Sequence, residues 1–110
     1  MKLGNTIKHL RKQQGILQQV LAEACGISVT YLSQIENDRK TPNLSVLEEI
    51  SRVLGVPLPI LFFLSLSNED VPTEKLEVYA TLAPPVRALI ERIFLEPTTP
   101  EVRDSKAVST

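Results

Sequence analysis

The chain has 110 residues and a mass of 12.2 kDa, which allows one small domain with a short accessory segment. Its 12 Lys and Arg residues nearly balance its 13 Asp and Glu residues, so the chain as a whole is neither a polycation nor an acidic tail protein. Residues 1–42 nevertheless carry six basic and three acidic side chains, a net of +3, against six basic and ten acidic, a net of −4, in residues 43–110. This asymmetry predicts that the N-terminal end meets an anion.

The cysteine content and the apolar runs restrict the expected cellular location. Cys25 is the single cysteine, so an intramolecular disulfide is excluded, and a reducing cytoplasmic location is expected. The first residues lack the apolar run of a signal peptide, and the uncharged stretch 53–66 is shorter than the roughly 20 residues of a membrane span. His9 is the single histidine, and we expect neither a metal site nor a cofactor.

Helical periodicity runs through the first 36 residues. Leu3, Ile7 and Leu10 form one stripe, and Gly15 ends that helix. A second helix is predicted over residues 18–24, with inward-facing residues Val20, Leu21 and Ala24. Gly26 breaks the chain, and a third helix over residues 29–36 is capped by Ser28 and buries Leu32 and Ile35.

Two further helices complete a predicted bundle. Ser45 is expected to cap the fourth helix, with Glu48 at the capping-box position and Gly55 at its end. A short apolar helix follows over residues 59–64. No run of strict alternation is long enough for a sheet, so the fold class is all-α.

Beyond Ser65 the pattern predicts a linker over residues 67–70 and a helix over residues 73–82 capped by Thr73, although 78–81 also reads as strand. Pro84–Pro85 are expected to begin a separate helix, because proline suits a first turn. One face of that helix carries Val86, Leu89, Ile90, Ile93 and Phe94. Pro97 ends it, and residues 97–110 are predicted to be a flexible tail.

The informative segment is residues 18–36, where two short helices meet at a tight turn containing Gly26. Ala22 allows a close helix approach, and Ile27 fills the angle between the helices. The arrangement is that of a helix-turn-helix, whose second helix enters the DNA major groove.

Here the sequence resembles the Cro and phage-repressor type of helix-turn-helix domain (XRE-like), over roughly residues 4–64. The matching residues are Ile7, Leu10–Arg11, Gln18, Leu21–Ala22, Gly26–Ser28, Tyr31–Asn37, Pro42, Leu44, Leu47, Ile50 and Leu54–Val56. The resemblance implies a five-helix lambda-repressor-like bundle over residues 1–66 and double-stranded DNA as the partner. The one or two extra helices expected over residues 67–96 follow from the periodicity alone, and this segment is the predicted dimerisation region.

The resemblance also implies roles for single residues. The implied DNA-binding set is Gln18, Ser28, Val29, Thr30, Tyr31, Ser33, Gln34, Asn37, Arg39 and Lys40. Of these, Val29, Thr30, Ser33 and Gln34 match base-reading positions, and Gln34 has the amide that pairs with adenine. Arg11 and Glu36 match a structural ion pair of the family.

Two positions depart from the family pattern. Leu17 stands where Ser or Thr usually precedes the glutamine, which removes a side-chain cap. Asp38 stands where glycine is common, and its negative charge argues against a close phosphate approach there.

Excess apolar surface predicts self-association. Phe62 and Phe63 are adjacent and cannot both face one core, so one is expected to be exposed in a monomer. With the stripe of residues 86–94 they predict a homodimer interface. The alternative is that the last helix folds back on the fifth helix.

The leading hypothesis is therefore a sequence-specific DNA-binding transcription regulator, by default a repressor, that acts as a dimer on a two-fold symmetric operator. The alternative is a protein-interaction module of antitoxin or adaptor type, which keeps the fold and binds a protein partner at the C-terminal helix. An enzyme is not expected, because the sequence has no Gly-rich phosphate loop, metal-ligand cluster or triad at useful spacing.

Overall fold

The computed structural model describes residues 1–96, and every regular element within that range is helical. The flexible tail predicted for residues 97–110 lies outside the described residues. Five helices form a bundle: α1 (Leu3–Gln13), α2 (Gln18–Ala24), α3 (Val29–Glu36), α4 (Leu44–Leu54) and α5 (Leu58–Ser65). Two short 3₁₀ turns, Asn68–Asp70 and Thr73–Lys75, lead to α6 (Leu76–Ile90), which a π-type turn extends over Glu91–Leu95.

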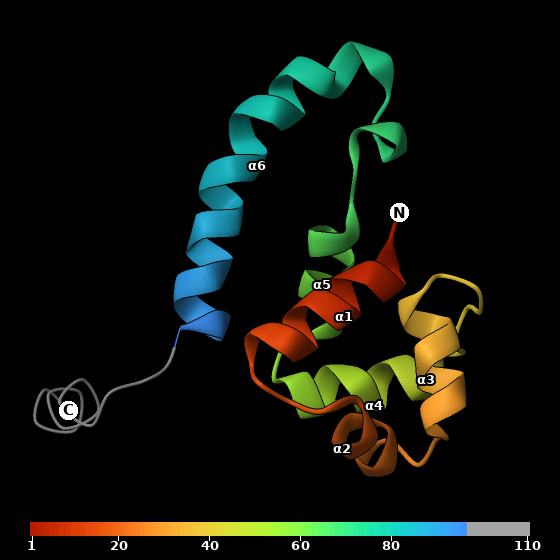
Figure 1. Ribbon diagram of the computed structural model, residues 1–110. Coiled ribbons are helices and arrows are strands. Elements are labelled where there is room, and N and C mark those ends of the chain that lie inside the picture. Colours follow the sequence, from red (N-terminus) through yellow and green to blue (C-terminus); the bar gives the residue numbers. More distant parts are fainter. Residues whose placement is uncertain (97–110) are drawn as a thin grey trace, which may run out of the picture.

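The bundle closes over one apolar core to which all five helices contribute. The most deeply buried side chains are Ile7, Leu21, Leu32, Ile35, Ile50, Val56 and Leu61. Figure 1 shows α1 crossing in front of α5 and α4 running below them, with α2 and α3 together at one end of the bundle. The all-helical fold class predicted from periodicity is confirmed.

The turn between α2 and α3 is built as the sequence predicts. Gly26 has φ of +69°, a left-handed conformation that glycine adopts without steric cost. The Gly26 and Ile27 amides donate to the carbonyls of Glu23 and Ala22 at 3.1 and 3.0 Å, which closes the end of α2. Ser28 then caps α3 by accepting from the Tyr31 amide at 3.0 Å.

The inward face of α2 differs from the prediction. Leu21 and Ala22 are buried, whereas Val20 and Ala24 are exposed. Successive residues of a helix are separated by about 100°, so a seven-residue helix that buries position 21 turns positions 20 and 24 toward solvent. Apolar character alone did not identify the buried side.

The cap of α4 was also predicted at the wrong residue. Asn43, not Ser45, precedes the helix, and its Oδ1 accepts from the Val46 amide at 2.9 Å. Ser45 lies inside the first turn and is exposed. Asparagine is as good a cap as serine, so residue type alone did not distinguish the two positions.

A single helix replaces the two helices predicted after residue 72. Thr73 does not cap it; residues 73–75 form a 3₁₀ turn after Pro72, and α6 then passes through Pro84 and Pro85. Pro84 and Pro85 lie inside the helix and do not begin one. The carbonyls that lose their helical donors belong to residues 80 and 81, which are exposed, so water can bond them and the helix continues. The strand reading of residues 78–81 was wrong as well.

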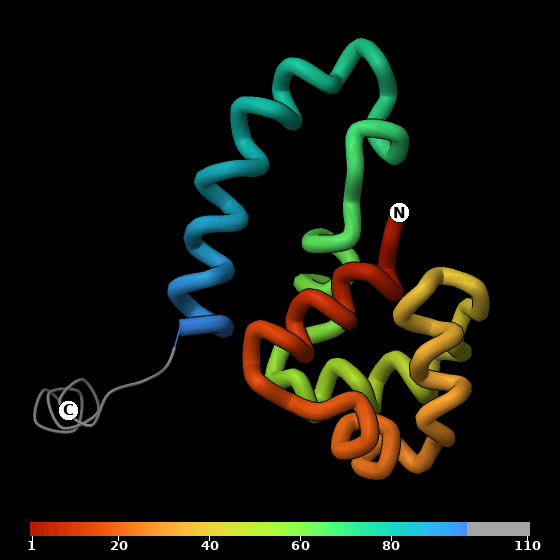
Figure 2. The backbone as a smooth tube through the Cα atoms, viewed as in Figure 1, coloured from red at the N-terminus to blue at the C-terminus, as the bar shows by residue number. Residues whose placement is uncertain are grey.

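The C-terminal half of α6 folds back toward the bundle, as the course of the tube in Figure 2 shows. Ala83 and Ile90 are buried, and Phe94 and Leu95 pack against the core. The predicted apolar face of residues 86–94 is therefore divided: Ile90 and Phe94 turn inward, whereas the stripe's other members stay largely exposed.

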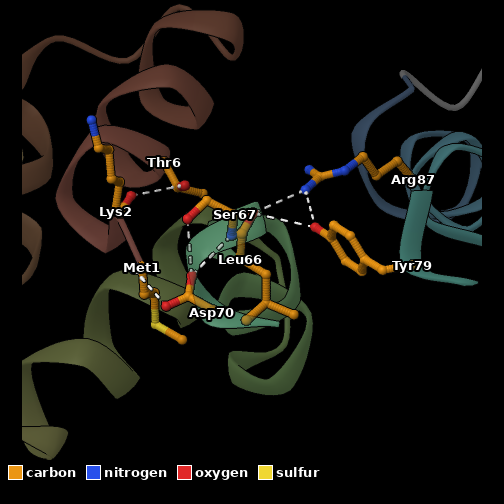
Figure 3. A network of polar contacts seen from close by, with 8 residues as sticks. All are labelled: Met1, Lys2, Thr6, Leu66, Ser67, Asp70, Tyr79 and Arg87. Atoms are coloured by element: carbon orange, nitrogen blue, oxygen red, sulfur yellow. Dashed lines mark hydrogen bonds and ion pairs between the residues drawn. The ribbon is translucent and has the colours of Figure 1, made fainter. Parts of the chain in front are cut away.

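Arg87 holds α6 to the end of α5. Its guanidinium donates to the Leu66 carbonyl and to the Tyr79 hydroxyl, each at 3.3 Å (Figure 3). It also donates to the Leu64 carbonyl at 3.5 Å. The same group lies 5.7 Å from the centre of the Phe63 ring. Arg87 thus satisfies carbonyls that the end of α5 leaves without helical donors.

Phe62 and Phe63 are both half-buried, so neither is the exposed phenylalanine that the sequence predicted. Phe62 packs against the core, and Phe63 lies beneath Arg87. The return of α6 supplies cover that the isolated fifth helix lacks.

The linker between α5 and α6 is ordered by a local cap and by the N-terminus. The Ser67 amide and hydroxyl donate to Asp70 Oδ2, and the Met1 ammonium lies 2.9 Å from Asp70 Oδ1 (Figure 3). This ion pair lowers the pKa of Asp70, first through the ammonium and then through the Ser67 amide. The segment that the sequence describes only as a linker is therefore tied to α1.

Candidate nucleic-acid interface

A buried ion pair joins the first helix to the third. Arg11 Nε lies 2.7 Å from Glu36 Oε2, and a second guanidinium nitrogen donates to Glu36 Oε1 at 3.1 Å. Arg11 is 8% exposed and Glu36 is 2% exposed, so the pair is shielded from water. A third guanidinium nitrogen donates to the Ile16 carbonyl at 2.9 Å. This bidentate arrangement is the geometry in which arginine binds a carboxylate most strongly.

Gln18 joins the same network from the start of α2. Its Nε2 donates to Glu36 Oε1 at 3.1 Å, so one carboxylate holds side chains from both α1 and α2. Leu17 precedes the helix without a side-chain cap. The sequence resemblance implies a DNA contact for Gln18 and does not indicate this internal hydrogen bond. The network fixes the end of α3 relative to both earlier helices.

The outer face of α3 carries one apolar and three polar side chains. Val29 and Thr30 are exposed, and Ser33 and Gln34 are half-buried; within residues 1–96 the Gln34 side chain makes no hydrogen bond. Leu32 and Ile35 point into the core on the opposite side. These four outer residues are the ones to which the family resemblance assigns base readout.

Ser28 and Tyr31 lie at the edge of this face. The Ser28 oxygen already accepts from the Tyr31 amide, which leaves its hydroxyl proton and one lone pair for a further contact. Tyr31 is half-buried, and its ring packs against the core. Both residues therefore have a structural task in addition to any contact with DNA.

The loop after α3 presents basic side chains on a closed backbone turn. The Arg39 and Lys40 amides donate to the Gln34 carbonyl at 2.9 and 3.2 Å, and both side chains are exposed. Asn37 Nδ2 donates back to the Ser33 carbonyl at 2.9 Å. The turn leaves the charged ends of Arg39 and Lys40 free of ion-pair partners among the described residues.

Asp38 has a role that sequence reasoning missed. Its φ is +57°, the sole left-handed conformation outside glycine among residues 1–96. Its carboxylate accepts from the Gly4 and Asn5 amides at 2.9 and 3.3 Å and so caps α1, whose preceding residue Lys2 supplies no side-chain cap. The negative charge expected to repel phosphate instead faces the positive end of a helix.

Gly4 makes this interhelical cap possible. It is buried, and a β-carbon added there would lie 1.8 Å from the Ile35 carbonyl oxygen, so only glycine lets α1 approach the end of α3 this closely. A glycine inside the first turn of an otherwise regular helix was the available signal. Its meaning required knowing which segment lies against it.

Cys25 lies beside the turn and is half-buried. Burial raises the pKa of its thiol, and the nearby Glu49 carboxylate adds to the effect. The thiol is thus protonated at neutral pH, which suits a packed side chain rather than a reactive one.

Comparison with known proteins assigns the family. A helix-turn-helix family model matches residues 7–61, and the chain belongs to this family, in its XRE-type form. No helix of residues 1–96 is long and apolar enough to cross a membrane.

Several regulators are similar over this region. The "Immunity repressor protein" of Bacillus phage phi105 is 43% identical over 56 residues, which are 51% of this chain and 39% of the repressor. The "HTH-type transcriptional regulator SinR" of Bacillus licheniformis is 40% identical over 73 residues, 66% of this chain and 61% of SinR. The chain thus matches less than two thirds of the length of each.

The crystal structure of ClgR, described as a clp gene regulator from Corynebacterium glutamicum, shares the fold. The TM-score is 0.57 and the sequence identity 24%, over 80% of this chain and 86% of that one. At this identity the likeness concerns the fold alone.

Proposed function

We propose that the protein is a sequence-specific DNA-binding transcription regulator that represses transcription as a homodimer on a two-fold symmetric operator. The observation that carries the proposal is the outer face of α3, which carries Val29 and the polar side chains. The inner face of the helix is fixed by the core and by the Arg11–Glu36 pair. A rigid helix with an accessible polar face is what major-groove readout requires. The repressor name of the phage relative supports repression as the mode of action.

Base recognition is assigned to four residues of α3. Gln34 carries an amide that pairs bidentately with the N6 and N7 atoms of adenine. Val29 and the Thr30 methyl group offer apolar contact to a thymine methyl, and Ser33 offers a hydroxyl that serves either base. The expected operator therefore contains A·T pairs opposite α3 in each half-site.

Phosphate contacts are assigned to residues around that helix. The Gln18 amide has a second hydrogen beyond the one donated to Glu36, and that hydrogen is available to a phosphate. Asn37, Arg39 and Lys40 are exposed directly after α3, and together with the Tyr31 hydroxyl they are assigned to the DNA backbone. With few exposed cations, we expect weak non-specific affinity.

The decisive experiment is selection from a random DNA pool followed by gel shift on the enriched site. Gln34→Ala is expected to lower affinity for that site by about tenfold to a hundredfold, the value of one bidentate pair. Gln13→Ala, an exposed glutamine at the far end of α1, is the matched control and should bind like wild type. Absence of an enriched motif, or equal binding by both variants, contradicts the proposal.

Salt dependence separates DNA binding from a protein-interaction role. Each neutralised phosphate contributes a slope of about −0.9 to the plot of log affinity against log salt. Arg39→Ala and Lys40→Ala are each expected to make the slope shallower by about 1. A flat plot favours the alternative, in which the fold serves a protein partner.

A further inference from the structure

The outer face of α6 carries a continuous apolar stripe. Five aliphatic side chains form it, and their exposed fractions are Val78 55%, Leu82 56%, Val86 39%, Leu89 57% and Ile93 60%. The adjacent side of the same helix is already covered, because Ala83 and Ile90 are buried against the molecule. The stripe is therefore surface that the monomer does not cover.

The stripe is symmetric about the Pro85–Val86 peptide. Leu82 lies three residues before Pro85 and Leu89 lies three residues after Val86. Val78 and Ile93 lie seven residues before and after the same two positions. Such a pattern matches itself when the helix is reversed, which is the requirement for a two-fold contact between identical surfaces.

The charges beside the stripe also favour reversal. The N-terminal end carries Glu74 and Glu77, which with Val78, Thr81 and Leu82 line a hollow of about 370 Å³. Arg92, at the C-terminal end, is exposed. In the reversed register Glu77 of one copy lies opposite residue 94 of the other, about 3 Å along the axis from Arg92. A parallel pair would place Glu74 and Glu77 against the same two residues and repel.

We propose that α6 pairs in antiparallel orientation with α6 of a second copy of this chain, across a two-fold axis at Pro85–Val86. Ile93 of each copy enters the hollow beside Val78 of the other, with Arg92 facing the Glu74–Glu77 end. The proposal rests on the homodimer of the proposed function. It keeps Val86, Leu89 and Ile93 of the interface that the sequence predicts, and it adds Val78 and Leu82. Ile90, Phe94, Phe62 and Phe63 pack within the monomer.

Arg87 gives the pairing a functional consequence. Because it ties α6 to the carbonyl end of α5, the paired helices hold the two bundles at a set separation. Two recognition helices about 34 Å apart reach successive major grooves on one face of DNA. Five half-exposed side chains per copy make a small interface. The low end for specific interfaces is about 1,200 Å² of accessible surface buried over both partners, and we therefore expect a micromolar dimer.

Mass as a function of concentration tests the surface. Sedimentation of the full chain is expected to show a monomer–dimer equilibrium, and Leu89→Glu should weaken dimerisation at least tenfold. Leu44→Glu is the matched control, because Leu44 is 59% exposed at the start of α4 and lies outside the stripe. Circular dichroism establishes that both variants stay helical. Because a micromolar dissociation constant is expected, a wild-type chain that is still monomeric at about 100 μM overturns the proposal. A Leu89→Glu variant that dimerises like wild type also overturns it.

Disulfide trapping tests the orientation. In a Cys25→Ser background, Leu82→Cys chains mixed with Leu89→Cys chains should cross-link to each other. Leu82→Cys alone should not, because its symmetry mate is about 10 Å away along the axis, beyond the reach of a disulfide. The reverse pattern indicates a parallel pair and refutes the proposed register.

The two proposals fail separately. If a dimer forms through α6 but no DNA motif is enriched, the pairing stands and the proposed function is wrong. If wild type binds a selected two-fold site and Leu89→Glu binds it equally well at limiting concentration, the function stands and the pairing is wrong. Loss of affinity for the two-fold site with unchanged affinity for a single half-site supports both.

Discussion

The buried Arg11–Glu36 pair makes a sharp stability prediction. Arg11→Met removes two hydrogen bonds from Glu36 and leaves a carboxylate, 2% exposed, with only Gln18 as a side-chain donor. Breaking a buried pair in this way costs about 3–5 kcal/mol. A small domain is stable by about 5–15 kcal/mol, so the variant should lose a large part of its free energy of unfolding. Glu36→Leu, which leaves the guanidinium buried without its carboxylate, should be destabilised similarly.

The double variant Arg11→Met, Glu36→Leu separates the interaction from the burial. Since both charges are gone, it should be within about 1–2 kcal/mol of wild type and more stable than either single variant. Urea unfolding followed by circular dichroism measures the free energy of unfolding of each variant. The free energies can be compared if the dependence on urea concentration has the same slope in every variant.

A matched control lies on the surface. Arg52 and Glu49 are also 2.7 Å apart, yet their side chains are 64% and 46% exposed. Arg52→Met should therefore have little measurable effect, because water and salt screen the exposed pair. Equal costs for Arg11→Met and Arg52→Met, or a double variant less stable than both singles, would refute the reasoning from burial.

Three further predictions concern the turn and the termini. Gly4→Ala should lower the free energy of unfolding by about 3 kcal/mol, measured in urea, because the new β-carbon meets the Ile35 carbonyl; a loss below about 1 kcal/mol contradicts the close approach. The Cys25 thiol should react with a disulfide reagent at pH 7 more slowly than a free cysteine and reach the free rate in urea; equal native rates contradict its raised pKa. Pairing with the Met1 ammonium lowers the pKa of folded Asp70 below its ordinary 3.8, so the pairing stabilises the fold at neutral pH and is lost as the pH falls through the lowered pKa. Acetylating the N-terminus should therefore raise the pKa of Asp70 in an NMR titration. No change in this pKa would contradict the pairing.

Helices α2 and α3 were predicted with their observed bounds because the signals that set them are local. Gly26 supplies the left-handed turn, and Ser28 supplies the cap three residues before the amide that it accepts from. Asn43 shows the limit of such signals. Asn43 and Ser45 are both good caps, and the local pattern does not decide which of them precedes the helix.

The outer face of the candidate site could likewise be predicted from spacing, whereas the roles proposed for its residues come from the family resemblance. The outer face of α3 follows from the burial of Leu32 and Ile35, since the residues between them must face elsewhere. The hydrogen bond from Gln18 to Glu36 could not be predicted from the sequence, because the two residues are eighteen positions apart in the chain. Hydrogen bonds over such separations depend on how helices cross.

The sequence by itself determined the helical class, the turn at Gly26 and the polar face of α3, because each depends on residues within a few positions of one another. Tertiary structure alone decided the cap of α1 by Asp38, which joins residues more than thirty positions apart. It also decided that α6 runs through Pro84–Pro85 and that Ile90 is buried while Leu89 is exposed. Which side of an apolar helix becomes surface depends on the neighbour that covers it, and local pattern does not contain that neighbour.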